Sequence, residues 1–175
     1  MKLMHHFILS TIFLCLIATQ CHKNGPPADN PYGLPNATQT GAGIFACLVN
    51  GQKFIAHYDA TLSGAKYSQD TIGVTGSPKI ADFSEVIGFQ VVGSPIQTGT
   101  YPINGMATYA EFLTDSTCLG ISFNETAANA TSGSVQLTKI DTVNKIISGT
   151  FQFVFPIPSC DTLKVTEGRF DYRYY

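Results

Sequence analysis

The chain has 175 residues, of which 44% are apolar and 13% are charged, and its formal net charge at pH 7 is −2. This length corresponds to one domain. The apolar fraction excludes a disordered chain, and the low charge excludes a coiled coil and a basic nucleic-acid-binding protein. We therefore expect one globular domain and no nucleic-acid partner.

The N-terminus has the pattern of an export signal. Lys2 lies in a short polar start, and residues 7–18 then carry no charge. A charged segment, a short apolar run and small residues before a boundary are typical of a secretory signal peptide. The run is shorter than the roughly 20 residues that span a bilayer. A buried core helix is the alternative, but the polar, proline-rich stretch that follows leaves such a helix nothing to pack against.

Cys21 indicates which kind of signal this is. The sequence Ala18-Thr19-Gln20-Cys21 resembles a bacterial lipobox, in which the cysteine becomes the first mature residue and carries lipid. Several acyl chains, such as palmitate, anchor a protein by burying CH₂ groups at about 0.8 kcal/mol each. We predict a lipoprotein signal peptide at residues 1–20 and a lipid anchor on Cys21, with ordinary secretion as the alternative. His22 stands where an inner-membrane retention signal has Asp, which favours the outer membrane; the sequence does not indicate the periplasmic or the surface face.

Residues 21–43 are expected to be the lipidated cysteine followed by a tether. The segment after Cys21 holds four Pro and four Gly and few large apolar residues. Such a composition cannot bury enough surface to fold, and it forms a semi-stiff spacer. The folded domain is then predicted at residues 44–175.

The domain has the periodicity of strands. Phe151, Phe153 and Phe155 fall at every second position, which places all three rings on one face of a strand and Thr150 and Gln152 on the other. Residues 134–141 form a second strand, and the turn formers at 141–144 predict a hairpin between the two. Further strands are predicted at residues 44–50, 53–57, 61–67, 70–75, 86–92, 98–103, 106–113 and, more weakly, 119–124, with Asn50-Gly51 as a hairpin turn.

A second row of rings lies at the C-terminus. Residues 162–166 and 169–174 are predicted as strands joined by a tight turn at Glu167-Gly168. Phe170, Tyr172 and Tyr174 would line one face of the last strand, with Arg169, Asp171 and Arg173 on a solvent-exposed face. We expect the two rows of rings to pack together, or one against the strand beside the other, and to form the main core.

No segment shows a convincing helical stripe of apolar residues. About 9–11 short strands with frequent turn signals predict an all-β domain, a single antiparallel β-sandwich or open barrel.

Several strings carry a family resemblance. The sequence TQTGAGIFACLVNG begins at Thr38, KIDTVNKIISGTFQF begins at Lys139 and TEGRFDYRY begins at Thr166, with Gly99-Thr100-Tyr101 between them. Together they resemble a family of small bacterial envelope lipoproteins known only as a domain of unknown function. The resemblance implies a lipoprotein of the cell envelope and no particular catalytic residues.

No catalytic or metal-binding motif is found. His57, with Asp59 two residues on, has the components of a hydrolytic pair, but there is no G-x-S-x-G elbow. H-E-x-x-H, C-x-x-C, calcium-loop and phosphate-loop patterns are also absent. We therefore assign no catalytic residue, no metal ligand and no cofactor.

The remaining cysteines allow one bridge in three ways. Cys47, Cys118 and Cys160 stay in the mature chain, in an oxidising compartment. Cys47 shares a strand face with Phe45 and Val49, which indicates a buried thiol. We therefore predict a Cys118–Cys160 disulfide.

Four Asp-Thr or Asp-Ser pairs resemble a bacterial O-glycosylation sequon, with Thr71, Ser116, Thr142 and Thr162 as the acceptors. The alternative is that Asp-Thr pairs simply start turns.

A non-catalytic binding or assembly module fits these observations best. Its partners would be the membrane, through the lipid, and a glycan or another envelope protein. An envelope hydrolase and a carrier of a small apolar ligand are the alternatives.

Overall fold

The computed structural model describes residues 30–58, 63–78, 85–105, 108–114, 128–156 and 162–175. The chain divides into two units, Met1–Gly33 and Leu34–Tyr175. In the first unit only a turn is described, in which the Gly33 N–H donates to the Asn30 carbonyl. The second unit holds every described strand and begins before the predicted start at Ile44. The predicted signal peptide and Cys21 lie outside the described residues.

The described elements are all strands. They are β1 (Ile44–Val49), β2 (Gln52–Ile55), β3 (Gly64–Ser68), β4 (Thr71–Gly76), β5 (Glu85–Val92), β6 (Gly99–Pro102), β7 (Thr108–Thr114), β8 (Ala128–Asn129), β9 (Ser132–Asp141), β10 (Ile146–Phe155) and β11 (Leu163–Arg173). Among these described residues no helix has the length and hydrophobicity needed to span a membrane. The weakly predicted strand at residues 119–124 lies outside the described residues.

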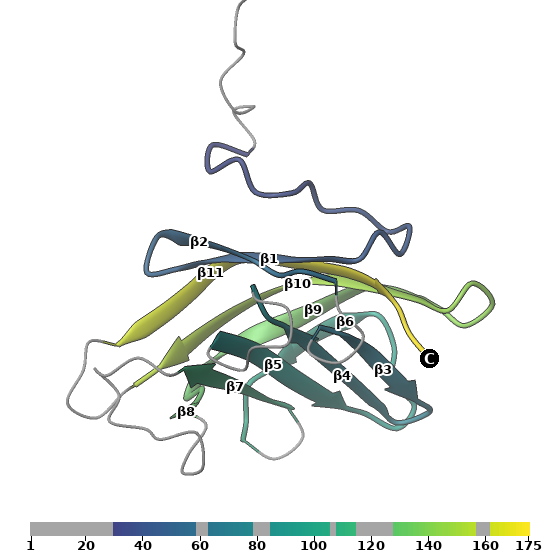
Figure 1. Cartoon of the computed structure of the whole chain (residues 1–175). Helices are drawn as coiled ribbons and strands as arrows, with labels where there is room; N and C mark the ends of the chain where they lie inside the picture. The colour runs from purple at the N-terminus through teal and green to yellow at the C-terminus, as the bar shows by residue number, and fades with distance from the viewer. Residues whose placement is uncertain (1–29, 59–62, 79–84, 106–107, 115–127, 157–161) are drawn as a thin grey trace, which may run out of the picture. The chain divides into compact units, whose positions relative to one another are not determined.

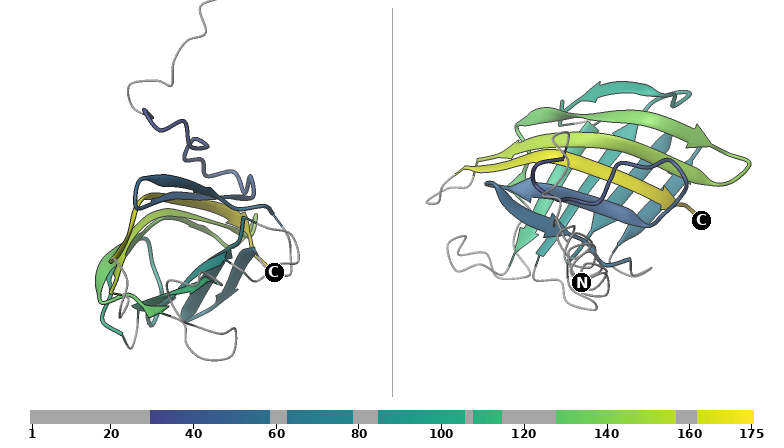
Figure 2. Two further views of the ribbon diagram at one scale, coloured as in Figure 1. Left: turned by 60° about the vertical axis from the view of Figure 1, so that its left-hand side comes forward. Right: turned by 90° about the horizontal axis from the view of Figure 1, so that it is seen from above.

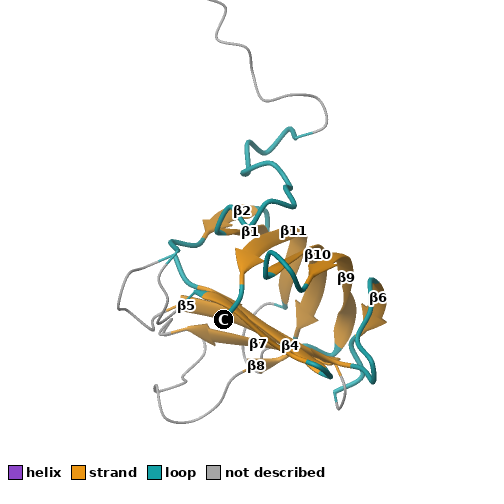
Figure 3. Ribbon diagram, turned by 90° about the vertical axis from the view of Figure 1, so that its right-hand side faces the viewer, coloured by secondary structure: helices purple, strands orange, loops and turns teal. Residues whose placement is uncertain are grey.

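The strands form two antiparallel sheets that face each other (Figure 1, Figure 3). The six-stranded sheet has the order β2-β1-β11-β10-β9-β6, and the five-stranded sheet has the order β3-β4-β5-β7-β8. An isolated parallel bridge between Ala65 and Tyr174 joins the sheets at one corner. The all-β class is confirmed, and the architecture is the sandwich.

Aromatic rings fill the space between the sheets. Phe153 and Phe155 of the six-stranded sheet are at most 1% exposed. Phe89, from β5 of the opposite sheet, lies 5.4 Å from the Phe151 ring centroid and 5.3 Å from that of Phe170. Because β10 and β11 are neighbours in the sheet, their two rows of rings share one inner face. This confirms the predicted core.

The two predicted hairpin turns at residues 50–51 and 141–144 are also confirmed. Asn50 and Gly51 both have positive φ, 48° and 80°, which matches the right-handed twist of β1 and β2. In the β9–β10 turn, Asp141 accepts the N–H groups of Val143 and Asn144 at 3.1 and 2.8 Å. The side chain of Asp141 therefore fixes the turn.

The predicted turn at Glu167-Gly168 is wrong. β11 runs without interruption through these residues, and it pairs with β10 on both sides of them. Glu167, not Gly168, has positive φ (54°), and the register of β11 shifts here relative to both β1 and β10. The feature is a β-bulge. A bulge and a tight turn favour the same residue types, and the pairing of β11 with strands on both sides selects the bulge.

Candidate functional site

Residues 34–43, which we call the strap, lie across the outer face of the six-stranded sheet (Figure 2). Leu34 is 3% exposed and packs with Ala46 and Leu48, the outward-facing side chains of β1. Arg169 donates to the Pro35 carbonyl at 3.4 Å. The strap therefore belongs to the folded unit, although its composition predicted a tether.

The strap is held mainly by Asp171 of β11. The carboxylate accepts the main-chain N–H groups of Thr40, Gly41 and Ala42 at 2.9, 2.8 and 3.1 Å. The hydroxyls of Thr38 and Ser148 donate to it at 2.5 and 2.6 Å. Asp171 is fully buried, so the prediction that it lies on a solvent-exposed face is wrong. Its position in the strand alternation is outward as predicted, but the strap covers that face.

These hydrogen bonds determine the ionisation of Asp171. Burial opposes the charged form, but the hydrogen bonds from Ser148, Thr38, Ala42 and Thr40 outweigh it and lower the pKa to about 2. The carboxylate is therefore charged at neutral pH, and its oxygens are already occupied by donors. This geometry suits a structural anchor for the strap and does not suit a general acid or base.

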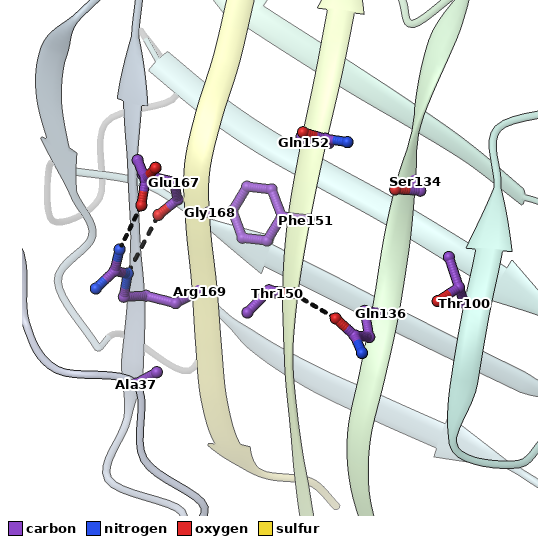
Figure 4. Close-up of a pocket in the computed structure, with 10 residues that line it drawn as sticks. All are labelled: Ala37, Thr100, Ser134, Gln136, Thr150, Phe151, Gln152, Glu167, Gly168 and Arg169. Atoms are coloured by element: carbon purple, nitrogen blue, oxygen red, sulfur yellow. Dashed lines mark hydrogen bonds and ion pairs between the residues drawn. The ribbon is translucent and has the colours of Figure 1, made fainter. Parts of the chain in front are cut away.

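Beside the strap, the outer face of the six-stranded sheet holds an open pocket of about 420 Å³ (Figure 4). Outward-facing side chains of four adjacent strands form its floor, and Ala37 of the strap forms one wall. The polar side chains of the floor are Thr100 from β6, Ser134 and Gln136 from β9, Thr150 and Gln152 from β10, and Glu167 and Arg169 from β11.

Strand register orders part of this floor into a straight row. Thr100 lies opposite Gln136, Gln136 lies opposite Thr150, and Thr150 lies opposite Arg169. In a second, shorter row Ser134 lies opposite Gln152. Neighbouring strands lie about 4.8 Å apart, so the first row spans roughly 14 Å. The ladders of the sheet hold these side chains at fixed spacing.

The charged groups of the pocket neutralise each other. The Arg169 guanidinium lies 3.3 Å from a Glu167 carboxylate oxygen and also donates to the Glu167 carbonyl at 3.1 Å. The guanidinium also donates to the Pro35 carbonyl of the strap. The other polar side chains of the floor are hydroxyls and amides, with the Thr150 hydroxyl 3.4 Å from the Gln136 amide oxygen. The pocket is therefore polar and close to neutral.

A smaller pocket, of about 300 Å³, lies over β3 and β4 of the five-stranded sheet. Its lining includes Lys66, Gly73, Thr75 and the C-terminal Tyr175. Its described lining comes from β3, β4, Ser63 and Tyr175, and it offers fewer polar side chains than the larger pocket.

The described residues do not assemble a hydrolytic site. His57 is exposed, Asp59 lies outside the described residues, and neither pocket includes His57. Within the described ranges no group of three or more His, Cys, Asp or Glu side chains could hold a metal ion.

The predicted modification sites are only partly described. Cys118, Cys160 and Ser116 lie outside the described residues, so the disulfide stays a prediction. Cys47 is a buried free thiol, as predicted, and burial raises its pKa to about 12. Thr142 and Thr162 are exposed, whereas Thr71 is half-buried. Thr142 is the most clearly presented acceptor, because it lies beside Val143, which is 89% exposed at the tip of the β9–β10 hairpin.

The pocket leaves no distinctive pattern in the sequence. Alternation predicts Thr150 and Gln152 on an outer face, but polar residues at alternate positions are the ordinary pattern of any solvated strand face. The sequence feature that could have indicated the pocket is the recurrence of outward-facing polar residues on several strands. Only the strand order shows that these strands are neighbours.

The fold and the pocket define an all-β sandwich domain with an open polar site on one sheet. A family model described as a domain of unknown function, DUF6252, matches residues 45–172, and the chain belongs to this family. The chain has no significant match to a curated protein or to a solved structure.

Proposed function

We propose that this chain is a lipid-anchored protein of the cell envelope whose domain is a non-catalytic binding module. The pocket on the outer face of the six-stranded sheet is its ligand site. The observation that carries this proposal is the convergence of hydroxyl and amide side chains from three adjacent strands on one open surface, beside the Glu167–Arg169 ion pair of a fourth strand. Because the strands fix the main-chain positions of these groups before a ligand arrives, little main-chain ordering is required on binding.

The anchoring part of the proposal rests on the N-terminal sequence. Cys21 follows a lipobox-like string, and Leu34 follows 13 residues later (34 − 21). An extended chain of that length reaches at most roughly 45 Å. This leaves the domain close to the membrane surface, and His22 favours the outer membrane.

Replacement of Cys21 tests the anchor. Cys21→Ala is expected to move the protein from the membrane fraction to the soluble fraction. Globomycin, which blocks cleavage of lipoprotein signals, should cause the uncleaved precursor to accumulate. Cys15→Ala is the matched control, because Cys15 leaves with the signal, and this variant should stay in the membrane fraction. Membrane retention of Cys21→Ala would contradict the anchor.

An NMR titration tests the binding site. The mature chain, labelled with ¹⁵N and carrying Cys21→Ser for solubility, is titrated with glycan and peptide fractions of the host cell envelope. We expect shifted amides to cluster at Thr100, Gln136, Thr150 and Gln152. Shifts that cluster instead at Lys66, Gly73 and Tyr175 would assign binding to the smaller pocket, and turnover of the added material would contradict a non-catalytic role.

A further inference from the structure

We infer that the ligand of the larger pocket is a short, linear, neutral oligosaccharide that lies across the strands along the row Thr100–Gln136–Thr150–Arg169. This inference rests on the proposed function and specifies its ligand class. It follows from the charge of the pocket, its polarity, its place in the sheet and the order of its side chains.

The charge of the pocket disfavours an ionic ligand. Arg169 and Glu167 form an ion pair within the lining, and Arg169 also donates to main-chain carbonyls. An anion would have to compete with Glu167 for Arg169, and a cation would have to compete with Arg169 for Glu167. All other polar side chains of the floor are uncharged.

The polarity of the floor disfavours an apolar ligand. Ala37 supplies a methyl group, and Phe151 is 4% exposed because its ring faces the core. An apolar molecule would cover the amide groups of Gln136 and Gln152 without offering hydrogen bonds to them, which is unfavourable.

The place of the pocket in the sheet disfavours an extended peptide. Peptides that bind sheets by strand addition pair with the free main-chain groups of an edge strand. β9 and β10 lie inside the six-stranded sheet, and at these positions their main chains pair with strands on both sides. Along β9 and β10 only side chains are offered to a ligand, and they combine donors and acceptors in hydroxyls and carboxamides.

A linear sugar chain matches this arrangement. Its hydroxyl groups recur at regular intervals and act as both donors and acceptors, as do the side chains of the row. Strand spacing sets those side chains about 4.8 Å apart along a line of roughly 14 Å. The row begins on the edge strand β6 and ends beside the strap on the β11 side. None of the described side chains of Tyr58, Tyr67 and Tyr101 lines the pocket, so binding relies on hydrogen bonds.

The experiment is calorimetric titration of the mature chain with three sets of probes. These are neutral oligomers of glucose, mannose, galactose and N-acetylglucosamine; uronate and sulfated oligomers of similar length; and uncharged peptides. We expect at least one neutral oligomer to bind, with affinity that increases from monomer to trimer. The double change Gln136→Ala and Gln152→Ala should weaken binding at least about tenfold.

Thr75→Ala, on the outer face of the five-stranded sheet, is the matched control and should leave affinity unchanged within about twofold. Thermal melts verify that every variant is folded. Binding only of charged oligomers or of peptides, lost with the same two glutamines, would overturn the assignment to a neutral oligosaccharide while supporting the pocket as a ligand site. Neutral-oligomer binding that survives the glutamine changes would overturn the site. Absence of binding to every probe by folded protein would overturn the inference, and the NMR titration above would still test the proposed function independently.

Discussion

Two glycines determine how the rings of Phe151 and Phe170 fit into the core. Gly149 of β10 lies opposite Phe170 of β11, and Gly168 of β11 lies opposite Phe151 of β10. A Cβ atom on Gly149 would lie 2.8 Å from the Phe170 ring, and one on Gly168 would lie 2.5 Å from the Phe151 ring. Each ring therefore covers the glycine of the neighbouring strand, in a reciprocal pair.

Gly149→Ala should destabilise the domain strongly. The added Cβ would also lie 2.1 Å from the Gln136 carbonyl oxygen, which belongs to the sheet and cannot move freely. We expect a loss of at least about 1–3 kcal/mol in the free energy of unfolding, measured in urea. Gly73→Ala is the control, since a Cβ there meets nothing within 4 Å, and its effect should stay within about 0.5 kcal/mol. Equal effects of the two changes would contradict this account.

Asp171 should make stability depend on pH in acid. Its pKa is about 2 in the folded protein and about 3.9 in an unfolded chain. A lowered pKa stabilises the folded state above the unfolded value, so this contribution is present above pH 4 and is lost as the pH falls towards 2. Asp171→Asn should therefore reduce the free energy of unfolding by about 2 kcal/mol at pH 7 and by less at pH 3.

Urea unfolding of both proteins at several pH values measures this difference. The comparison with Asp171→Asn is needed because Asp141 titrates in the same range. Hydrogen bonds from Asn144 lower the pKa of Asp141 to about 2 as well. A difference between the two proteins that stays constant from pH 7 to pH 2.5 would contradict the role of the Asp171 charge.

At the scale of elements, the row of Phe rings on β10 is the part of the core whose loss should reduce stability most. Phe153 is 1% exposed and stacks on Phe151 with ring centroids 5.3 Å apart. Phe153→Ala should reduce the free energy of unfolding by about 3–5 kcal/mol because it leaves a cavity between the sheets. Lys164→Ala, at an exposed position of the adjacent strand β11, should have little effect. Thermal melts compare the two, and equally mild effects would contradict the assignment of the core.

The strap is a second element whose contribution can be measured. A chain that begins at Leu34 keeps the Leu34 contact with β1 and the donors to Asp171, whereas a chain that begins at Ile44 loses both. We expect the first chain to melt like the mature protein and the second to be destabilised by at least about 2 kcal/mol. If the two chains melt at the same temperature, the strap contributes nothing to stability. Leu34→Ala, in the mature chain, should show a smaller loss of the same sign.

At the scale of the whole molecule, the predicted Cys118–Cys160 bridge would tie together two connections that the structure does not describe. Cys47 is buried as a free thiol, which leaves these two cysteines as the available pair. The bridge should contribute about 4 kcal/mol through loop entropy. Intact-mass measurement of the mature protein should show a gain of two hydrogen atoms on reduction. No gain on reduction, or a bridged peptide that contains Cys47, would contradict the pairing.

The strap also relates the anchor to the pocket along the chain. The segment that follows Cys21 enters the folded unit at Leu34, and Ala37, three residues later, forms a wall of the pocket. In the proposed lipoprotein the tether therefore joins the domain at its ligand-binding face.

Local sequence determined the class of fold, most of the strands and two of the hairpin turns. Alternation of apolar and polar residues identifies which face of a strand is buried, and Asn50-Gly51 specifies its turn through backbone conformation alone. Phe153, Phe170 and Cys47 were placed in the core for the same reason. These features depend on residues close together in the chain.

Only the tertiary structure decided the features that depend on which strands are neighbours. Glu167-Gly168 has the residues of a turn, but pairing of β11 with both β1 and β10 makes it a bulge. Asp171 is outward-facing by alternation and buried in fact, because a segment about 130 residues earlier supplies hydrogen-bond donors that compensate its charge. The pocket likewise requires the order β6-β9-β10-β11, which brings Thr100 into line with Gln136, Thr150 and Arg169. Sequence periodicity is a property of single strands, whereas burial of a charge and assembly of a site are set by contacts between strands.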